Sequence, residues 1–353
     1  MTKYKSYKGL KVLITGSTGF KGSWLCLWLY LLGARVYGLS LKNQKENILF
    51  SSLNLQKKIK QYDCDINNYK KTNDLIKKIK PDIIFHLAAQ ALVTDSYLDP
   101  LKTFETNVFG GAVIMKSFIE NKINSMVFCT SDKCYKNKEQ ISGYIESDEI
   151  GGSDPYSASK ACAEILFNSF VTSYDLNLKN TNCASVRPGN VIGGGDFGKE
   201  RLIPDIIKNF YNGTTVKIKN PLSIRPWQFV LEPLDGYLKL GLILMNKQKR
   251  FQLPSWNFGP DSKQFYTVDQ LIKYTKQNFL KNLKIKYKKK RKNYETKTLF
   301  VNNEKAKKEL AWKPRLQFNS MLDNTFDWYS NYYSSNDMLK FSITQIEKYS
   351  QLK

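Results

Sequence analysis

Short, continuously apolar runs alternate along the chain with longer segments whose apolar residues recur every three or four positions. The apolar runs predict strands, at residues 11–15, 35–41, 82–89, 125–131 and 182–191. The periodic segments predict helices, from the glycines after the first strand to residue 32 and over residues 69–79, 101–120 and 156–174. Strands that lack a polar face are typical of a parallel sheet covered by helices on both sides. The pattern therefore predicts an α/β fold with a doubly wound parallel sheet.

Three glycines follow the first predicted strand and open the first predicted helix. Gly16, Gly19 and Gly22 permit a tight turn that brings backbone N–H groups to a diphosphate. We therefore expect a dinucleotide cofactor at this turn and a Rossmann-type domain around it. Lys21 lies inside the loop, where it either adds charge beside the phosphates or is a solvated side chain.

The residues that distinguish NAD from NADP depart from the usual pattern. No acidic residue occurs from residue 23 through residue 45, where one normally binds the ribose 2′-hydroxyl of NAD. Ser40, Lys42 and Asn43 stand at the end of the second predicted strand instead, so the loop leaves NADP open. Asp65 is placed either to bind the adenine edge or to form a turn.

A phenol and an amine stand at the start of the helix predicted over residues 156–174. Tyr156 and Lys160 are four residues apart and share one helix face. A nearby cation favours the phenolate, and each unit by which the pKa of Tyr156 falls corresponds to ~1.36 kcal/mol. We therefore interpret Tyr156 as a general base near neutral pH, helped by Lys160.

Three polar residues stand at the end of the strand predicted over residues 125–131. Ser131 is placed to hydrogen-bond the hydroxyl that Tyr156 deprotonates. Asp132 and Lys133 face the crevice at the carboxyl ends of parallel strands, where ligands bind. An acid and a base beside a hydride-transfer centre are what a β-elimination requires, and the alternative is a surface ion pair.

The alternation of strands and helices weakens after Gly193, where segments bearing Pro, Gly and Trp replace it. We interpret this part as a smaller substrate-binding lobe, interleaved with the end of the first domain. The expected dinucleotide-binding domain covers residues 1–185 and 226–256. The lobe then covers residues 186–225 and 257–335, and residues 336–353 form a C-terminal tail.

Composition changes this picture only through its charge. The chain has 353 residues, 42% of them hydrophobic, which allows two domains. Lys and Arg number 55 against 31 Asp and Glu, a net charge of +24 that alone suggests a polyanionic ligand. The dense basic block at residues 281–292 is interpreted as a solvated face, because no nucleic-acid-binding motif accompanies it. We expect neither a nucleic acid nor a membrane as partner.

The cysteines and the single histidine exclude some kinds of chemistry. The six cysteines form no C-x-x-C pair, and we expect reduced, buried thiols. His86 stands alone, so we expect a core histidine and no metal site. The basic N-terminus lacks an apolar segment, and no apolar stretch reaches the ~20 residues that span a bilayer, so a cytoplasmic protein is expected.

Several motifs occur together in a combination that is specific to one family. They are residues 16–25, 85–93, 130–137, 151–164, 185–197, 201–206, 224–238 and 256–260. From about residue 11 to residue 328 the chain resembles the extended short-chain dehydrogenase/reductases, and most closely the family of CDP-glucose 4,6-dehydratases. The first and fourth motifs are shared across the superfamily, whereas the motifs at residues 131–133, 189–196 and 224–228 are specific to far fewer of its members.

The resemblance implies NAD as cofactor, a nucleotide sugar as substrate and a definite sequence of steps. Tyr156, assisted by Lys160 and Ser131, would remove the proton of the sugar 4-hydroxyl while hydride leaves C4. Lys133, where related dehydratases carry Glu, would take part in removing the C5 proton. Asp132 would protonate the departing 6-hydroxyl, and hydride return to C6 would give a 4-keto-6-deoxy sugar.

The resemblance also implies binding residues and an assembly. Expected cofactor contacts are Gly16, Ser17, Gly19, Phe20, Lys21, Gly22, Asp65, Ile66, Ala88, Ala89, Tyr156 and Lys160. Expected nucleotide-sugar contacts are Asn190, Arg201, Arg225 and Gln228. Arginine suits a diphosphate because its planar fork donates two charge-assisted hydrogen bonds. Trp227 either lines the same cleft or is a core residue, Ser17 replaces a histidine common in the family, and a homodimer or homotetramer is expected.

Two other functions account for parts of the sequence. A 4-epimerase of the same superfamily needs Tyr156 and Lys160 but has no use for Asp132 and Lys133. A polyanion-binding protein built on an inert Rossmann scaffold needs none of these residues. A 4,6-dehydratase is therefore the favoured hypothesis.

Overall fold

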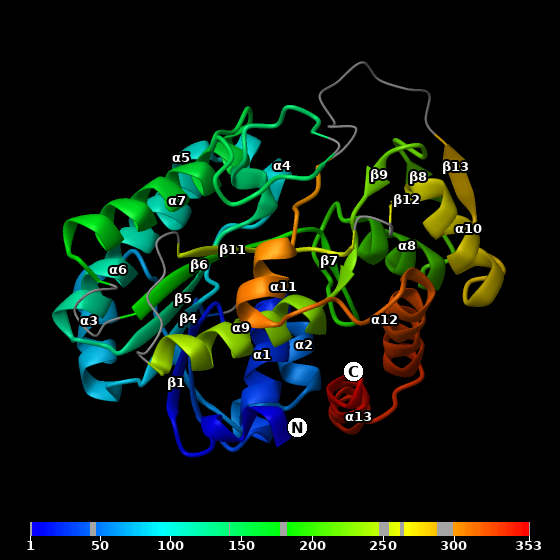
Figure 1. Ribbon diagram of the computed structural model, residues 1–353. Coiled ribbons are helices and arrows are strands. Elements are labelled where there is room, and N and C mark those ends of the chain that lie inside the picture. The colour runs from blue at the N-terminus through cyan, green and yellow to red at the C-terminus, as the bar shows by residue number, and fades with distance from the viewer. Residues whose placement is uncertain are drawn as a thin grey trace.

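The apolar runs assemble into one parallel sheet at the centre of the molecule (Figure 1). The computed structural model describes residues 2–42, 47–140, 142–176, 182–246, 254–261, 265–287 and 299–352. The strands follow the order β11-β6-β5-β4-β1-β2-β3 across the sheet. Their bounds are Lys11–Thr15 (β1), Arg35–Ser40 (β2), Lys60–Asp63 (β3), Ile83–His86 (β4), Ser125–Cys129 (β5), Asn182–Pro188 (β6) and Ser255–Phe258 (β11). The winding reverses between β1 and β4, which confirms the predicted doubly wound sheet.

The five strands predicted from the sequence are confirmed, whereas β3 and β11 are not predicted from the pattern of apolar residues. β3 lies at the edge of the sheet, and its four residues are half-buried or exposed, so it carries no apolar run. β11 is fully buried at the opposite edge, but it has only four residues and follows the weakly patterned segment. Short strands of this kind give too few positions for a periodicity to be read.

Helices cover both faces of the sheet because successive side chains of a strand point to opposite faces. Val12 and Ile14 of β1 belong to the core shared with α1 (Phe20–Leu31) and α9 (Leu231–Met245). Leu13 belongs to the other core, with α3 (Tyr69–Ile79), α6 (Gly110–Glu120) and α7 (Pro155–Ser173). Figure 1 shows these two groups of helices separated by the sheet.

The helix predicted over residues 101–120 is interrupted in its middle. It consists of α5 (Pro100–Phe104), a π-helical turn (Glu105–Phe109) and α6. Asn107 in that turn donates to Ser159 Oγ at 2.9 Å and to the Gln90 carbonyl at 3.0 Å. The wider turn therefore directs a buried amide at the helix that carries Tyr156.

A second group of elements lies beside the carboxyl ends of the strands. Its helices are α8 (Leu202–Tyr211), α10 (Val268–Asn278) and α12 (Phe318–Tyr333). Its short strands pair as β7–β10 (Val191–Ile192 and Gln228–Phe229), β8–β13 (Val216–Ile218 and Ile285–Tyr287) and β9–β12 (Ile224–Arg225 and Tyr266–Thr267). The remaining elements are α2 (Ile48–Ser52), α4 (Val93–Leu98), α11 (Glu304–Leu310) and 3-10 helices at Thr2–Tyr7, Leu55–Lys57 and Asp132–Cys134.

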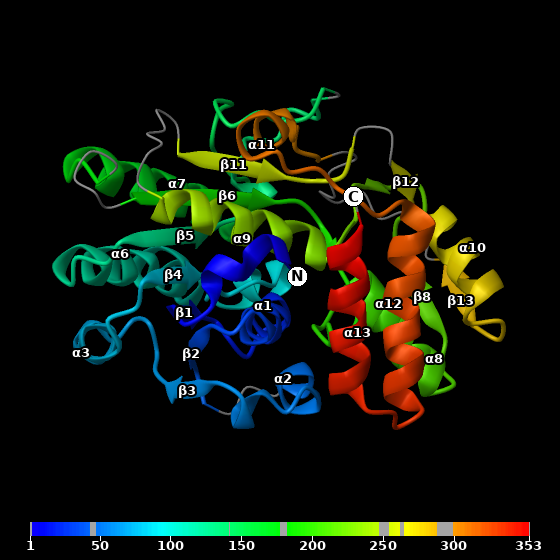
Figure 2. The ribbon, with the colours of Figure 1, turned by 60° about the horizontal axis from the view of Figure 1, so that its bottom comes forward.

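The segment predicted as a C-terminal tail contains a helix, α13 (Met338–Gln351), that lies beside α12 (Figure 2). Ile346 and Tyr349 of α13 are buried in the core that α1 shares, and the Tyr349 ring lies 5.8 Å from that of Trp28. The proposed division of the chain into two domains stays a prediction.

Candidate active site

Close backbone contacts hold the glycine-rich turn between β1 and α1. Gly16 has a φ of +71°, and a Cβ there would lie 2.8 Å from the backbone of Ala88. A Cβ on Gly22 would lie 2.0 Å from the Gly16 carbonyl oxygen, so both positions require glycine. A Cβ on Gly19 would be tight at 3.3 Å from the same oxygen. The turn thus has the geometry expected of a dinucleotide-binding loop, with the N-terminus of α1 beside it.

Ser17 begins a chain of hydrogen bonds that joins the turn to the ends of β2 and β3. Ser17 Oγ donates to Gln61 Oε1 at 2.8 Å, and Gln61 Nε2 donates to Ser40 Oγ at 2.8 Å. Ser40 pairs in register with Asp63, whose carboxylate accepts the Lys42 N–H at 2.8 Å. The acidic residue that is missing from the end of β2 is therefore replaced in space by Asp63, at the end of the neighbouring strand β3. Asn43, named with Ser40 and Lys42 in the sequence, falls outside the described residues.

Other predicted cofactor contacts follow the same edge of the sheet. Asp65 Oδ1 accepts the Asn67 N–H at 2.9 Å, so it forms the turn that was one of its two alternatives. Ile66 is buried, and its side chain would meet a Cβ built on Gly110 at 2.6 Å. Ala88 donates its N–H to Thr15 Oγ1 at 3.2 Å, and both Ala88 and Ala89 are half-buried. These positions follow the carboxyl ends of β3 and β4, beside the turn.

Lys21 reaches across this edge toward the end of β5. Its Nζ donates to Cys129 Sγ at 3.4 Å. Lys21 is in α1, which follows β1, Cys129 ends β5, and β4 lies between these two strands. The side chain is half-buried. This position is not that of a fully solvated lysine, and a contact with the cofactor phosphates stays a prediction. Phe20, the preceding residue, faces Gly193 near the start of the second group of elements.

The polar residues after β5 form a buried turn. Ser131 caps it by accepting the Lys133 N–H at 3.3 Å, and its Oγ donates to Asp132 Oδ1 at 2.8 Å. Asp132 is only 3% exposed, and burial raises the pKa of its carboxyl, although the Lys133 charge partly offsets this. The alternative of a surface ion pair is therefore wrong for Asp132, because the carboxyl is not at the surface.

Tyr156 and Lys160 lie one turn apart near the start of α7. Tyr156 is hydrogen-bonded with Ser131, which brings the predicted helix and strand residues together. Burial raises the pKa of Tyr156, and burial lowers the pKa of Lys160 to about 8. The predicted depression of the Tyr156 pKa by Lys160 is therefore wrong. Lys160 Nζ lies 6.0 Å from the centre of the Tyr156 ring, and burial is the largest influence on the pKa of both groups.

Sequence reasoning misses a buried ion pair behind these residues. Glu164, one turn beyond Lys160 on α7, pairs with Arg187 of β6 at 2.6 Å, and neither side chain is more than 1% exposed. Thr130, the residue before Ser131, donates to the same carboxylate. The pair therefore fixes the end of β5 against α7. A glutamate and an arginine inside otherwise apolar segments are the signal that was available, since buried charges require partners.

Two of the predicted substrate contacts lie in the second group of elements. Arg201, the residue before α8, donates two hydrogen bonds of 2.9 Å from Nη1 to the carboxylate of Asp196. It also lowers the pKa of Tyr156 in part, which places its charge near the catalytic residues. Arg225 of β9 is half-buried, and its Nη1 donates to the Ile224 carbonyl at 2.9 Å.

The other two predicted substrate contacts, Asn190 and Gln228, make hydrogen bonds between neighbouring segments of the chain. Gln228 is 2% exposed, and its Nε2 donates to the Phe258 carbonyl at 2.7 Å. Its Oε1 is buried without a partner among the described residues. The Asn190 carbonyl accepts the Gln228 N–H at 2.9 Å. Trp227 is buried with its ring 6.4 Å from that of Phe318, which confirms the core alternative.

His86 is the core histidine that the sequence predicts. Its Nδ1 lies 2.7 Å from Thr15 Oγ1, and burial lowers its pKa to about 3. The six cysteines are free, and all but Cys162 are buried, as predicted. Among the described residues, no group of three or more His, Cys, Asp and Glu side chains is placed to hold a metal ion.

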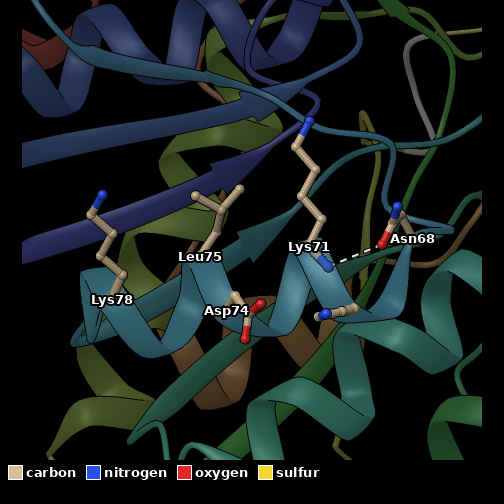
Figure 3. Close-up of a pocket in the computed structure, with 6 residues that line it drawn as sticks. Asn68, Lys71, Asp74, Leu75 and Lys78 are labelled. Atoms are coloured by element: carbon tan, nitrogen blue, oxygen red, sulfur yellow. Dashed lines mark hydrogen bonds between the residues drawn. The ribbon is translucent and has the colours of Figure 1, made fainter.

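A shallow hollow on the surface lies elsewhere, along α3 (Figure 3). Its lining comes from that helix and the residue before it: Asn68, Lys70, Lys71, Asp74, Leu75 and Lys78. None of the predicted catalytic or binding residues lines it, so we do not assign the chemistry there. No helix in the described part of the chain is both long and apolar enough to cross a membrane.

Known proteins resemble this chain over nearly its whole length. The family model described as GDP-mannose 4,6 dehydratase matches residues 13–325. A CDP-glucose 4,6-dehydratase of Salmonella typhimurium is 38% identical over 348 residues, which cover 97% of this chain and 97% of that protein. A UDP-glucose 4-epimerase of Halalkalibacterium halodurans is 23% identical and covers 92% of this chain and 96% of its own.

Solved structures agree on the fold. The structure of dTDP-glucose 4,6-dehydratase from Bacillus anthracis in complex with NAD superposes with a TM-score of 0.75 at 18% identity, covering 94% of this chain and all of that one. This likeness shows the fold alone, a Rossmann-type parallel sheet with flanking helices. The sequence match carries more, and it confirms the resemblance expected from the motifs. The chain belongs to the GDP-mannose 4,6 dehydratase family.

Proposed function

We propose that this protein is an NAD-dependent hydro-lyase that converts CDP-glucose to CDP-4-keto-6-deoxyglucose. The observation that carries the proposal is the meeting of two segments, residues 131–133 after β5 and the start of α7. A general base, a buried acid and a lysine thereby share one edge of the sheet. The 38% identity to the CDP-glucose 4,6-dehydratase of Salmonella typhimurium supports both the reaction and the nucleotide.

The glycine-rich turn and its neighbours are proposed to hold the cofactor. The contacts at Gly16 and Gly22 leave no space for a Cβ, which is the fit that close backbone approach to a diphosphate requires. Ser17, Phe20, Asp65, Ile66, Ala88 and Ala89 complete the proposed cofactor site. Asp63 beside Ser40 favours NAD, because its negative charge repels a 2′-phosphate. NAD held there would supply a reversible hydride acceptor for oxidation at the sugar C4 and reduction at C6.

Tyr156 is proposed to take the proton of the 4-hydroxyl in the first step. Ser131 hydrogen-bonds with it and is placed to bind the same substrate oxygen. The Arg201 charge lowers the pKa of Tyr156 in part, which favours the phenolate. Lys160, whose Nζ lies 6.0 Å from the ring centre, is proposed to help stabilise the developing 4-oxygen anion. The product of this step is a 4-ketone.

Asp132 and Lys133 are proposed to carry out the elimination. The 4-ketone acidifies the C5 proton, and Lys133 takes part in its removal. The C5–H electron pair forms the C5–C6 double bond, while the 6-hydroxyl leaves as water with a proton from Asp132. The buried position of Asp132 favours its protonated form, as an acid needs. Hydride at C6 and a proton at C5 complete the product, which is the substrate minus one water.

Asn190, Arg201, Arg225 and Gln228 are proposed to bind the nucleotide diphosphate. Arg225 is on β9 and Gln228 is on β10. Asn190 immediately precedes β7, and Arg201 immediately precedes α8. These positions bring the four residues toward the carboxyl ends of the strands of the central sheet. Gln228 Oε1 accepts no hydrogen bond from the described residues, and a ligand hydroxyl or amino group would supply the donor. The basic block at residues 281–292 is described only to residue 287, and we assign it no role.

We also propose a homodimer formed through α4, α5 and α7. Large apolar side chains on these neighbouring helices face solvent, namely Leu98, Leu101 and Ile165, which are 84%, 83% and 59% exposed. Exposed large apolar side chains on adjoining helices favour an interface between subunits. Light scattering should give twice the chain mass for the wild type and the single-chain mass for Ile165→Glu. A homotetramer and the cytoplasmic location stay predictions.

The reaction itself is tested by the mass of the product. Incubation of the purified protein with CDP-glucose and NAD should yield a nucleotide sugar lighter by one water. UDP-, GDP- and dTDP-glucose assayed in parallel test the nucleotide, and CDP-glucose should have the highest kcat/KM. A C4-inverted sugar of unchanged mass would instead identify a 4-epimerase. Steep salt-dependent binding of duplex DNA without any turnover would identify a polyanion-binding protein.

A further inference from the structure

Two helices hold the loop at residues 193–198, which lies between β7 and α8. The Tyr329 hydroxyl of α12 donates to the Asp196 carbonyl oxygen. The Trp24 indole N–H of α1, the helix after the glycine-rich turn, donates to the Gly194 carbonyl oxygen at 3.0 Å. The 193–198 loop is therefore fixed both to the first helix of the proposed cofactor site and to the second group of elements.

The Asp196 side chain connects this loop with Arg201, the residue before α8. Both carboxylate oxygens accept from Arg201 Nη1 at 2.9 Å, and Oδ1 also accepts the Gly198 N–H at 3.0 Å. A Cβ on Gly198 would lie 3.2 Å from Cδ and Cζ of Arg201, so the arginine packs against backbone that bears no side chain. The Asp196 side chain is 7% exposed, whereas that of Arg201 is 35% exposed. A buried carboxylate thus holds an arginine that stays partly accessible.

This ion pair orders a side chain that the proposed mechanism uses. An arginine loses rotamer freedom when it binds a ligand, and that loss reduces affinity. A carboxylate that orders Arg201 before the ligand arrives removes part of the cost. Both hydrogen bonds to Asp196 come from Nη1, which differs from the two-nitrogen fork with which arginine binds a phosphate. The geometry of the pair is therefore compatible with a bound diphosphate.

We propose that Asp196 is a positioning residue of the substrate site, which holds Arg201 in place for the diphosphate of the nucleotide sugar. The inference rests on the proposed function, in which Arg201 contacts that diphosphate. A carboxylate beside an arginine has an opposite effect as well, because it competes with an anionic ligand for the guanidinium. Positioning strengthens binding of the diphosphate and competition weakens it, so the sign of the effect decides between them.

The test is a double-mutant cycle on Asp196 and Arg201 in the full chain, read as the dissociation constant of CDP by calorimetry. We expect Asp196→Ala to weaken CDP binding by about 5- to 20-fold, and Arg201→Met by at least as much. The variant with both changes should bind CDP within about twofold of Arg201→Met alone, because Asp196 acts through Arg201. Glu304→Ala, which removes an exposed carboxylate paired with Lys307 on α11, is the control and should leave CDP affinity unchanged.

Two further measurements separate positioning from a general loss of structure. The NAD dissociation constant, measured on the same samples, should change less than about twofold in every variant of the cycle. In turnover of CDP-glucose, Asp196→Ala should raise KM and change kcat less than about threefold, because the Arg201 charge near Tyr156 is kept. Equal weakening of CDP and NAD binding in Asp196→Ala would overturn the inference, because the aspartate would then only support the fold.

The cycle has other outcomes that overturn the inference. Tighter CDP binding by Asp196→Ala would show that the carboxylate competes with the diphosphate. Losses that add in the doubly changed variant would show that Asp196 acts without Arg201, and unchanged affinity in Arg201→Met would leave Asp196 nothing to position.

Failure of the proposed function is distinguished by the product. Absence of dehydrated product from CDP-glucose and the wild type would overturn the proposed function alone, because the cycle is read from binding. A wild type that prefers UDP, GDP or dTDP changes the nucleotide of the proposed function, and the cycle is then carried out with the diphosphate that binds most tightly. A wild type that binds none of the four overturns both proposals.

Discussion

The edge of the sheet that carries the proposed catalytic residues is built differently from the group of elements that carries the proposed substrate arginines. Asp132, Tyr156 and Lys160 are at most 8% exposed, and the buried ion pair of Glu164 with Arg187 fixes the strand and helix that hold them. The strands of the other region have two or three residues and form two-stranded sheets. Proton transfer requires fixed distances in a dry site, whereas recognition of a flexible diphosphate tolerates adjustment.

The largest effect on turnover should come from the rigid edge. Tyr156→Phe removes the proposed general base but keeps the ring, so kcat for dehydration of CDP-glucose should fall by about 10²- to 10⁴-fold. The measurement is the steady-state rate of product formation, with NAD binding as a check on the fold. Arg225→Met in the other region should mainly raise KM. Equal losses of kcat in the two variants would remove the distinction between the regions.

The buried ion pair should dominate the stability of the rigid edge. Arg187→Met leaves Glu164 buried without its partner, which is expected to lower the free energy of unfolding by about 3–5 kcal/mol. Lys116→Met breaks the exposed pair with Glu120 on α6 and should cost at most about 1 kcal/mol. Urea unfolding of both variants measures the contrast. Similar losses would show that the pair does not fix the edge.

A smaller effect should appear as a pH dependence of stability. The pKa of His86 is about 3 in the folded chain, below its ordinary value near 6.5, so the unfolded chain binds an additional proton between these values. Stability should therefore fall as the pH decreases below 6.5, by about 2 kcal/mol at pH 5 from this residue alone. His86→Asn should show a shallower decrease between pH 7.5 and pH 5. Parallel curves for the variant and the wild type would contradict the neutral, buried state of His86.

The sequence predicts correctly those features whose residues all lie within one short segment of the chain. The β1 turn with its glycines, and Tyr156 with Lys160, each lie within one short segment, and both are found where the sequence places them. The missed features depend on distant partners. Glu164 meets Arg187 across 23 positions, and Lys21 meets Cys129 across 108. The error in the Tyr156 pKa has the same origin, because burial depends on the whole fold rather than on the neighbour four residues away.

The central claim is that hydride leaves C4 and returns to C6 of the same sugar. It is tested most directly with CDP-glucose deuterated at C4 and with NAD in catalytic amount, by NMR of the product. The proposed mechanism predicts deuterium in the C6 methyl group of a 4-keto-6-deoxy sugar. Deuterium retained at C4 of a sugar that has lost no water would contradict it.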